Sequence, residues 1–190
     1  MNAWMKKPAK ATVVLLALLA AGSAVGACHS PGPYSHAILY APLPEEERAS
    51  KGALEFDPVM SKRRPDDYRK TAFFGVVVAR TPGAAGLSNL TVSLRTREQR
   101  NICANRNDED TCRVTVSDTE FGVLHALVIV RPEDDIGEFA LAPGSLVRVV
   151  ANYKGDSDAS DGLPTVRATY YRHFPRHFYR TRADASVLRQ

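Results

Sequence analysis

The chain has 190 residues, of which 44% are hydrophobic and 24% are charged, and its formal net charge at pH 7 is +4. Three lysines within the first ten residues supply most of that charge, so the rest of the chain is close to neutral. This excludes the strongly basic composition typical of many nucleic-acid-binding proteins. The length fits one ordinary domain with a real hydrophobic core.

The first 27 residues have the three-part composition of a secretory signal peptide. Lys6, Lys7 and Lys10 precede an apolar stretch over residues 11–25, and small residues follow it. The apolar stretch has 15 residues, whereas a membrane-spanning helix needs roughly 20. We therefore predict that residues 1–27 are a cleaved leader rather than a permanent transmembrane anchor.

The motif Val25-Gly26-Ala27-Cys28 resembles the lipobox of bacterial lipoproteins, in which an aliphatic residue and two small residues precede a cysteine. The resemblance implies cleavage before Cys28, a diacylglyceryl thioether on its sulfur and an acyl chain such as palmitate on its new amine. Two or more acyl chains anchor a protein stably to a membrane. His29 after the cysteine, in place of Asp, implies the outer membrane of a Gram-negative envelope, with the domain in the periplasm. The alternative is an ordinary signal peptide followed by an unrelated cysteine.

Two cysteines remain once Cys28 is assigned to lipid. Cys103 and Cys112 would then lie in a compartment in which disulfides persist, so we predict that they pair. A zinc site formed by the two thiolates is the alternative. A structural zinc ion requires four His or Cys ligands, however, and no further His or Cys lies nearby in the sequence. His173 and His177 bracket a proline, which disfavours a helical metal pair. We expect neither a metal ion nor a cofactor.

Residues 28–70 are rich in proline and charge and show little apolar periodicity. We predict that they carry the lipid anchor and form a mostly irregular tether. One short helix is expected near residues 44–54, because Pro44 suits a first helical position and Glu45 to Glu47 suit the first turn.

From residue 71 the sequence is typical of β-strands. Alternating patterns or continuous apolar runs predict strands over residues 73–79, 90–97, 112–116, 121–130, 145–153 and 164–174. The charged segment after residue 131 leaves room for one helical turn, and residues 154–162 are expected to form a polar hairpin tip. We therefore predict a β domain over residues 71–182, followed by a disordered tail over residues 183–190.

This order of strands resembles the five-stranded Greek-key barrel of OB-folds. The segment from Leu141 to Val149 (LAPGSLVRV) is similar to the leucine, turn, glycine and alternating valines that commonly open the fourth OB strand. We predict an all-β fold, a small five- or six-stranded Greek-key barrel. A β-sandwich is the alternative, although the Cys, Trp, Cys pattern of immunoglobulin domains is missing.

The stretch from Arg167 to Arg182 (RATYYRHFPRHFYRTR) interleaves basic and aromatic residues. Such a pattern suits a polyanion, because guanidinium groups bind phosphate or carboxylate groups and rings stack against bases or sugars. The candidate ligand-binding residues are Arg167, Tyr171, Arg172, His173, Arg176, His177 and Arg180. The alternative is a structural strand that buries Val166, Ala168, Tyr170 and Phe174 and lays its arginine stems over the surface.

No motif resembles a hydrolase elbow, a phosphate loop or a zincin helix, so we do not expect an enzyme. The first hypothesis is a lipid-anchored envelope protein with a non-catalytic binding or structural role. The second is an extracytoplasmic OB-type module that binds a polyanion, with an anionic glycan or an envelope protein as partner and nucleic acid disfavoured by the location. An envelope enzyme would require polar side chains that converge in a pocket, for example around His125 or His173.

Overall fold

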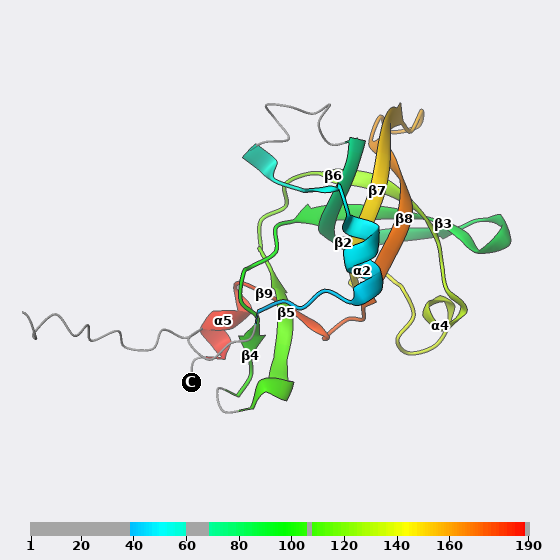
Figure 1. The fold of residues 1–190 in the computed structure, drawn as a ribbon. Coiled ribbons are helices and arrows are strands. Elements are labelled where there is room, and N and C mark those ends of the chain that lie inside the picture. Colours follow the sequence, from blue (N-terminus) through cyan, green and yellow to red (C-terminus); the bar gives the residue numbers. More distant parts are fainter. Residues whose placement is uncertain (1–38, 60–68, 106–107, 189–190) are drawn as a thin grey trace, which may run out of the picture. The chain divides into compact units, whose positions relative to one another are not determined.

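The structure is a computed structural model that describes residues 39–59, 69–105 and 108–188 (Figure 1). The predicted signal peptide, Cys28 and the first residues of the expected tether lie outside these ranges. Within them, no helix combines the length and the apolar composition needed to cross a membrane.

Five strands close into a barrel (Figure 1). The antiparallel neighbours are β2 (Lys70–Pro82) with β3 (Leu87–Arg95), β3 with β6 (Val123–Ile129), and β7 (Leu146–Ser157) with β8 (Pro164–Phe174). β6 and β8 pair in parallel, and antiparallel pairing of β2 with β7 closes the barrel. The predicted small OB-like barrel is therefore confirmed, and the alternative β-sandwich is excluded.

Apolar side chains from all five strands fill the barrel. They occupy alternate positions where a strand is regular, because successive side chains of a strand point to opposite faces. The members include Phe73, Val77, Leu90, Val92, Leu124, Ala126, Val128, Val147, Val149 and Val166.

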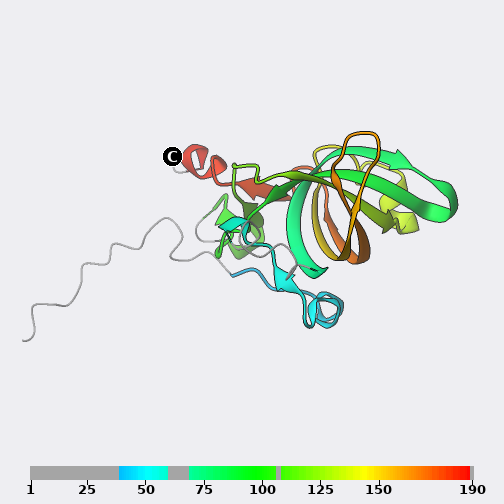
Figure 2. The same cartoon turned by 90° about the horizontal axis from the view of Figure 1, so that it is seen from above.

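A second, smaller three-stranded sheet lies beside the barrel (Figure 2). It consists of β4 (Ile102–Cys103), β5 (Cys112–Val116) and β9 (Tyr179–Thr181). The predicted disulfide between Cys103 and Cys112 is present and joins β4 to β5. The remaining elements are α2 (Pro44–Ser50), β1 (Leu54–Glu55), the 3-10 turns η3 (Ala84–Gly86) and η4 (Glu109–Thr111), α4 (Pro132–Asp135) and α5 (Asp184–Val187).

Residues 39–59 are folded against the outer face of the barrel, which differs from the expected irregular tether. α2 begins at Pro44, as predicted, and β1 pairs in parallel with β2. Glu46 of α2 is only 1% exposed, because its carboxylate faces the guanidinium groups of Arg148 and Arg172. The sequence suggested solvated charges here, whereas the structure pairs them with basic residues about a hundred positions away.

The C-terminal segment also differs from its prediction. Residues 184–187 form α5, and Ala185 is buried. The carboxylate of Asp184 accepts a hydrogen bond from the backbone of Thr181 at 2.8 Å and so connects α5 to β9. The expected disordered tail is therefore wrong for this part of the chain.

Candidate anion-binding site

A β-bulge in β8 determines where the candidate ligand-binding residues point. Beyond the pair Val150 and Tyr170, the register with β7 skips Thr169, whose hydroxyl donates to the Val150 carbonyl oxygen at 3.1 Å. One extra residue reverses the alternation of side chains that follow it. Tyr171 consequently lies in the barrel core and Tyr170 does not. The expectation that Tyr170 is the core residue is wrong for this reason.

Tyr171 and His173 converge on the carboxylate of Asp134, which α4 supplies. The Tyr171 hydroxyl donates to Asp134 Oδ2 at 2.6 Å, and His173 Nδ1 lies 3.0 Å from Asp134 Oδ1. The other ring nitrogen, Nε2, lies 3.0 Å from the hydroxyl of Ser145. Because an ionised carboxylate only accepts hydrogen bonds, Nδ1–H donates to Asp134 and Nε2 accepts from Ser145. Arg131 completes the group with an ion pair of 3.0 Å to Asp134.

This order of serine, histidine and carboxylate is also found in hydrolases, where the serine hydroxyl must reach a substrate. Here Ser145 is 2% exposed and the side chain of His173 is 2% exposed. The Ser145 hydroxyl also accepts a hydrogen bond from the backbone of Ala142 at 3.3 Å. The arrangement therefore connects the α4 loop to the end of β8 and presents no nucleophile to solvent.

Burial sets the protonation state of His173, whereas hydrogen bonds and a nearby cation set that of Asp134. It lowers the pKa of His173 below the ordinary value, and the neighbouring Asp134 carboxylate offsets only part of that effect. Burial alone would raise the pKa of Asp134, but hydrogen bonds from Tyr171 and His173 and the nearby Arg131 outweigh it, so that pKa is lowered. A neutral imidazole beside an ionised carboxylate follows at neutral pH.

We expect the domain to lose stability as the pH falls from about 7 to about 5. A histidine whose pKa in the folded state lies below its unfolded value of about 6.5 binds a proton more readily in the unfolded chain, so protonation favours unfolding in this window. The midpoint of thermal unfolding should decrease on acidification, and His173→Gln should flatten the decrease. His177→Gln, which removes an exposed histidine of the same segment, is the matched control. Equal slopes in the wild type and His173→Gln would contradict this assignment.

Two more of the candidate residues lie apart from each other. Arg172 points to the outer face of the barrel, where its guanidinium lies 3.4 Å from Glu46 and donates to the carbonyl oxygen of Ala41 at 3.3 Å. Arg167 is exposed at the start of β8. Together with Tyr171 and His173, these residues form no common surface, so the sequence stretch is not one continuous ligand-binding strand.

The remaining three candidates, Arg176, His177 and Arg180, line one hollow of about 320 Å³. β8 ends before Pro175, which has no N–H to donate to a neighbouring strand, and the chain then turns toward β9. The other lining residues are Gly144, Tyr179, Thr181 and Asp184. Sequence reasoning missed Gly144 and Asp184, because contact between distant segments places them here and no local pattern indicates it.

Two contacts shape the wall of this hollow. The Tyr179 hydroxyl donates to the carbonyl oxygen of Gly144 at 3.1 Å, which connects β9 to the loop before β7. The stem of Arg176 lies over Gly144, since a Cβ at that position would meet Arg176 Cδ at 3.5 Å. Gly144 also has a φ of +89°, which disfavours a side chain there.

The hollow is positively charged. Among the described residues, no side chain makes a hydrogen bond or an ion pair with the guanidinium group of Arg176 or Arg180. The one carboxylate in the wall, that of Asp184, already accepts the hydrogen bond from Thr181. Two guanidinium groups and an imidazole therefore remain available to an anion. In the described part of the chain, no cluster of three or more His, Cys, Asp or Glu could hold a metal ion.

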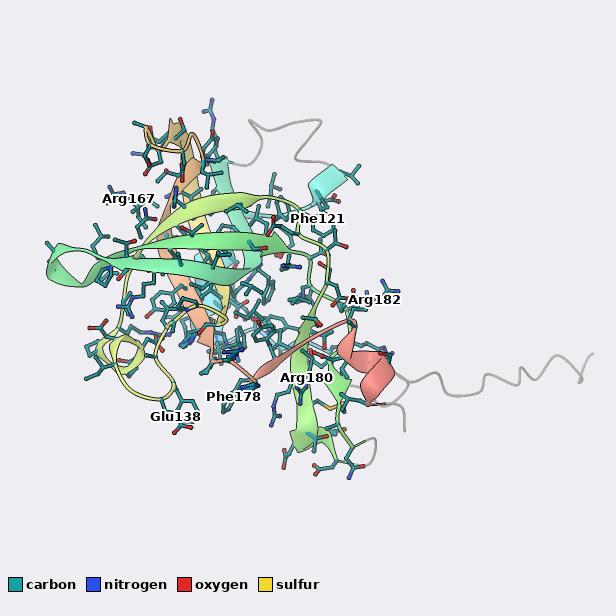
Figure 3. All side chains as sticks on the ribbon, turned by 180° about the vertical axis from the view of Figure 1, so that it is seen from behind. Phe121, Glu138, Arg167, Phe178, Arg180 and Arg182 are labelled. Atoms are coloured by element: carbon teal, nitrogen blue, oxygen red, sulfur yellow. A yellow bond between two sulfur atoms is a disulfide. The ribbon has the colours of Figure 1, made fainter. Side chains whose placement is uncertain are left out.

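An exposed aromatic pair includes Phe178, which lies in the chain between two lining residues of the hollow, His177 and Tyr179. Phe178 follows His177 in the chain and makes an edge-to-face contact with Phe139, with ring centroids 5.5 Å apart. The two residues are 46% and 51% exposed. Figure 3 shows Phe178 and Arg180 along the segment that leaves β8. A ring-shaped or apolar part of a ligand would find a partner next to the guanidinium groups.

Comparison with known proteins assigns no family to this chain. No family model matches the sequence, and no curated protein matches it significantly. We therefore infer the function from the residues and geometry of the chain itself.

Proposed function

We propose that this protein is a lipid-anchored binding module of the bacterial cell envelope, and that its OB-like barrel presents the basic hollow to an anionic ligand. The observation that carries the binding role is the hollow itself, in which Arg176, His177 and Arg180 meet beside a single carboxylate, that of Asp184, which already accepts a hydrogen bond from Thr181. We propose a non-catalytic role because the Ser145 hydroxyl is buried.

Two features of the chain support the location. The lipobox-like motif ends at Cys28 and follows a leader of the expected composition. The Cys103–Cys112 disulfide is typical of proteins that fold in an oxidising compartment such as the periplasm. We propose attachment to the outer membrane, as the residue after Cys28 implies.

The chemistry of the hollow favours carboxylate, sulfate or phosphate groups. A guanidinium group can bind such anions with two parallel hydrogen bonds, and these are stronger than hydrogen bonds between neutral groups. The volume of about 320 Å³ fits a small group such as one acidic sugar, at the lower end of ordinary ligand pockets. An anionic glycan is therefore the ligand class that we propose, with its charge on the arginines and a sugar ring against the Phe139 and Phe178 pair.

We expect the wild type to bind heparin oligosaccharides at low salt and to release them as the salt concentration rises. Arg176→Ala with Arg180→Ala should weaken binding by at least about tenfold, since a hydrogen bond to a charged group contributes about 1.5–3 kcal/mol. Titration calorimetry would measure the change. Arg167→Ala, which removes an exposed arginine outside the hollow, is the matched control and should bind as the wild type does.

Either of two outcomes would oppose the binding role: a wild type that ignores heparin and single-stranded DNA at low salt, or an Arg167→Ala variant that loses as much affinity as the double variant. The anchor is tested separately by intact mass and membrane fractionation in a Gram-negative host. The wild type should start at Cys28, carry acyl mass and sediment with membranes, whereas Cys28→Ser should do none of these.

A further inference from the structure

The folded segment 39–59 shortens the chain that connects the proposed anchor to the domain. Leu39, the first residue of the described ranges, pairs with Arg100 in an isolated antiparallel bridge, and residues 29–38 lie between it and Cys28 in the sequence. A fully extended chain from Cys28 to Leu39 spans at most about 40 Å. A tether that continued to residue 70 would reach about 150 Å. The surface around Leu39 therefore stays within about 40 Å of the proposed anchor.

That surface, here called the Leu39 face, consists of Leu39, Arg97, Gln99, Arg100 and Arg182. Leu39 is 61% exposed and the side chain of Arg182 is 71% exposed. Arg97 and Arg100 are also exposed, and Arg97 stacks over the ring of Tyr40 at 5.1 Å from its centroid. The face thus combines an exposed leucine with three arginines.

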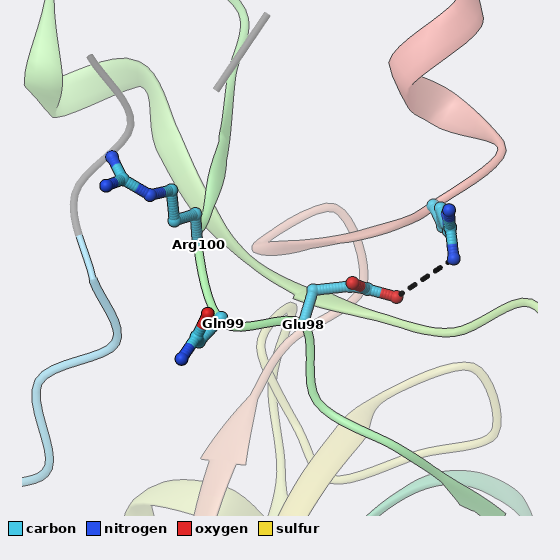
Figure 4. Close-up of a pocket in the computed structure, with 4 residues that line it drawn as sticks. Glu98, Gln99 and Arg100 are labelled. Carbon is cyan, nitrogen blue, oxygen red and sulfur yellow. Dashed lines mark ion pairs between the residues drawn. The ribbon is translucent and has the colours of Figure 1, made fainter. Parts of the chain in front are cut away.

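A shallow hollow of about 200 Å³ opens on this face (Figure 4). Glu98, Gln99, Arg100 and Arg182 line it. The Glu98 carboxylate lies 3.9 Å from the Arg182 guanidinium and neutralises part of the charge. Arg97 and Arg182 alone outnumber this one carboxylate, so the described residues of the face keep a net positive charge.

We propose that the Leu39 face rests on the headgroups of anionic phospholipids, an inference that depends on the proposed anchor at Cys28. Basic side chains are attracted to such a surface, and the attraction falls off within a Debye length of about 8 Å at physiological ionic strength. Only a face that the chain holds close to the membrane gains from it. An exposed leucine among arginines also suits the boundary between headgroups and acyl chains.

The test uses the mature chain, residues 28–190 with Cys28→Ser, secreted into the periplasm behind an ordinary cleavable leader so that the disulfide forms. We expect it to sediment with vesicles of phosphatidylglycerol and phosphatidylcholine but not with vesicles of phosphatidylcholine alone. Arg100→Gln with Arg182→Gln should weaken binding by about fivefold for each arginine. Lys154→Gln with Arg167→Gln removes the same charge from exposed positions elsewhere, and Figure 3 shows Arg167 well apart from Arg182. This control should bind as the wild type does.

If the two double variants lose the same vesicle affinity, binding depends on net charge alone and the proposal is overturned. A wild type that does not bind the anionic vesicles would also overturn it. The single variant Arg182→Gln provides a second measurement if circular dichroism shows that the double variant is misfolded. Because this chain carries no acyl group, its vesicle binding is independent of lipidation. A failure of the anchor at Cys28 would appear only in the intact mass of the wild type.

Discussion

Replacing Arg148 by methionine is expected to destabilise the domain by about 3 kcal/mol, at the lower end of the 3–5 kcal/mol for breaking a buried ion pair. Arg148 Nε lies 3.3 Å from Glu46, and the two terminal nitrogens lie 2.6 and 2.7 Å from the two oxygens of Glu55. Its guanidinium also covers the ring of Phe74 at 4.8 Å. Removal would leave the Glu46 carboxylate buried, with Arg172 as its only remaining cation among the described residues. Urea unfolding followed by circular dichroism measures the loss.

A double variant separates the lost ion pair from lost packing. Arg148→Met with Glu46→Gln removes both charges and should recover a large part of the stability, because the cost comes from the uncompensated carboxylate. Arg167→Met is the surface control and should change the free energy of unfolding by no more than about 0.5 kcal/mol. If Arg148→Met unfolds at the same urea concentration as Arg167→Met, the buried ion pair does not hold α2 on the barrel.

Gly75→Val is expected to cost about 3 kcal/mol or more, or to prevent folding. Gly75 lies in β2, where it pairs with Leu94 on one side and Val147 on the other, at the point where the barrel closes. A Cβ at this position would lie well inside van der Waals contact with Val92 and only 2.9 Å from the carbonyl oxygen of Ser93. Neither neighbour can move freely. Val92 is fully buried in the core, and the Ser93 carbonyl belongs to the backbone of β3, which pairs with β2 at this point.

The matched control for this position is Ala79→Val, at an exposed site of the same strand. A β-branched residue is acceptable on an exposed strand face, so this variant should keep the wild-type unfolding midpoint. Gly75→Ala should fall between the two, which gives a measurable value even if Gly75→Val does not fold. A Gly75→Ala variant as stable as the wild type would show that β2 and β3 can separate at this point without cost.

The five barrel strands and β5 were predictable because each one has a local pattern, whereas the short strands β1, β4 and β9 were not predicted. The alternation in Cys112 to Val116 and the run from Pro164 to Phe174 gave β5 and β8 with their bounds as the structure has them. The bulge at Thr169 has no such pattern, since it depends on how β8 fits the curvature of β7. One unrecognised residue was enough to place Tyr170 rather than Tyr171 in the core.

The polar contacts were less predictable, because they join residues far apart in the chain. Glu46 and Arg148 are 102 positions apart, and each has the sequence context of a solvated charge. No sequence pattern indicated that Asp134 and Ser145 contact His173. The three residues meet only because β8 pairs with β7 and places His173 beside both. The basic hollow was indicated in part, since Arg176, His177 and Arg180 belong to the unusual basic and aromatic stretch.

The parallel pairing of β6 with β8 has a consequence for the order of events in the export that we propose. β8 is the last long strand of the chain, and until it arrives β6 and β7 each have an unpaired edge, which is prone to pair with another chain. In the lipoprotein that we propose, Cys28 would cross the membrane far ahead of β8, so its acylation would precede barrel closure. Non-local strand pairing is also slow. The newly anchored chain would therefore wait at the membrane in an open form, in need of periplasmic chaperones, until residues 164–174 complete the barrel.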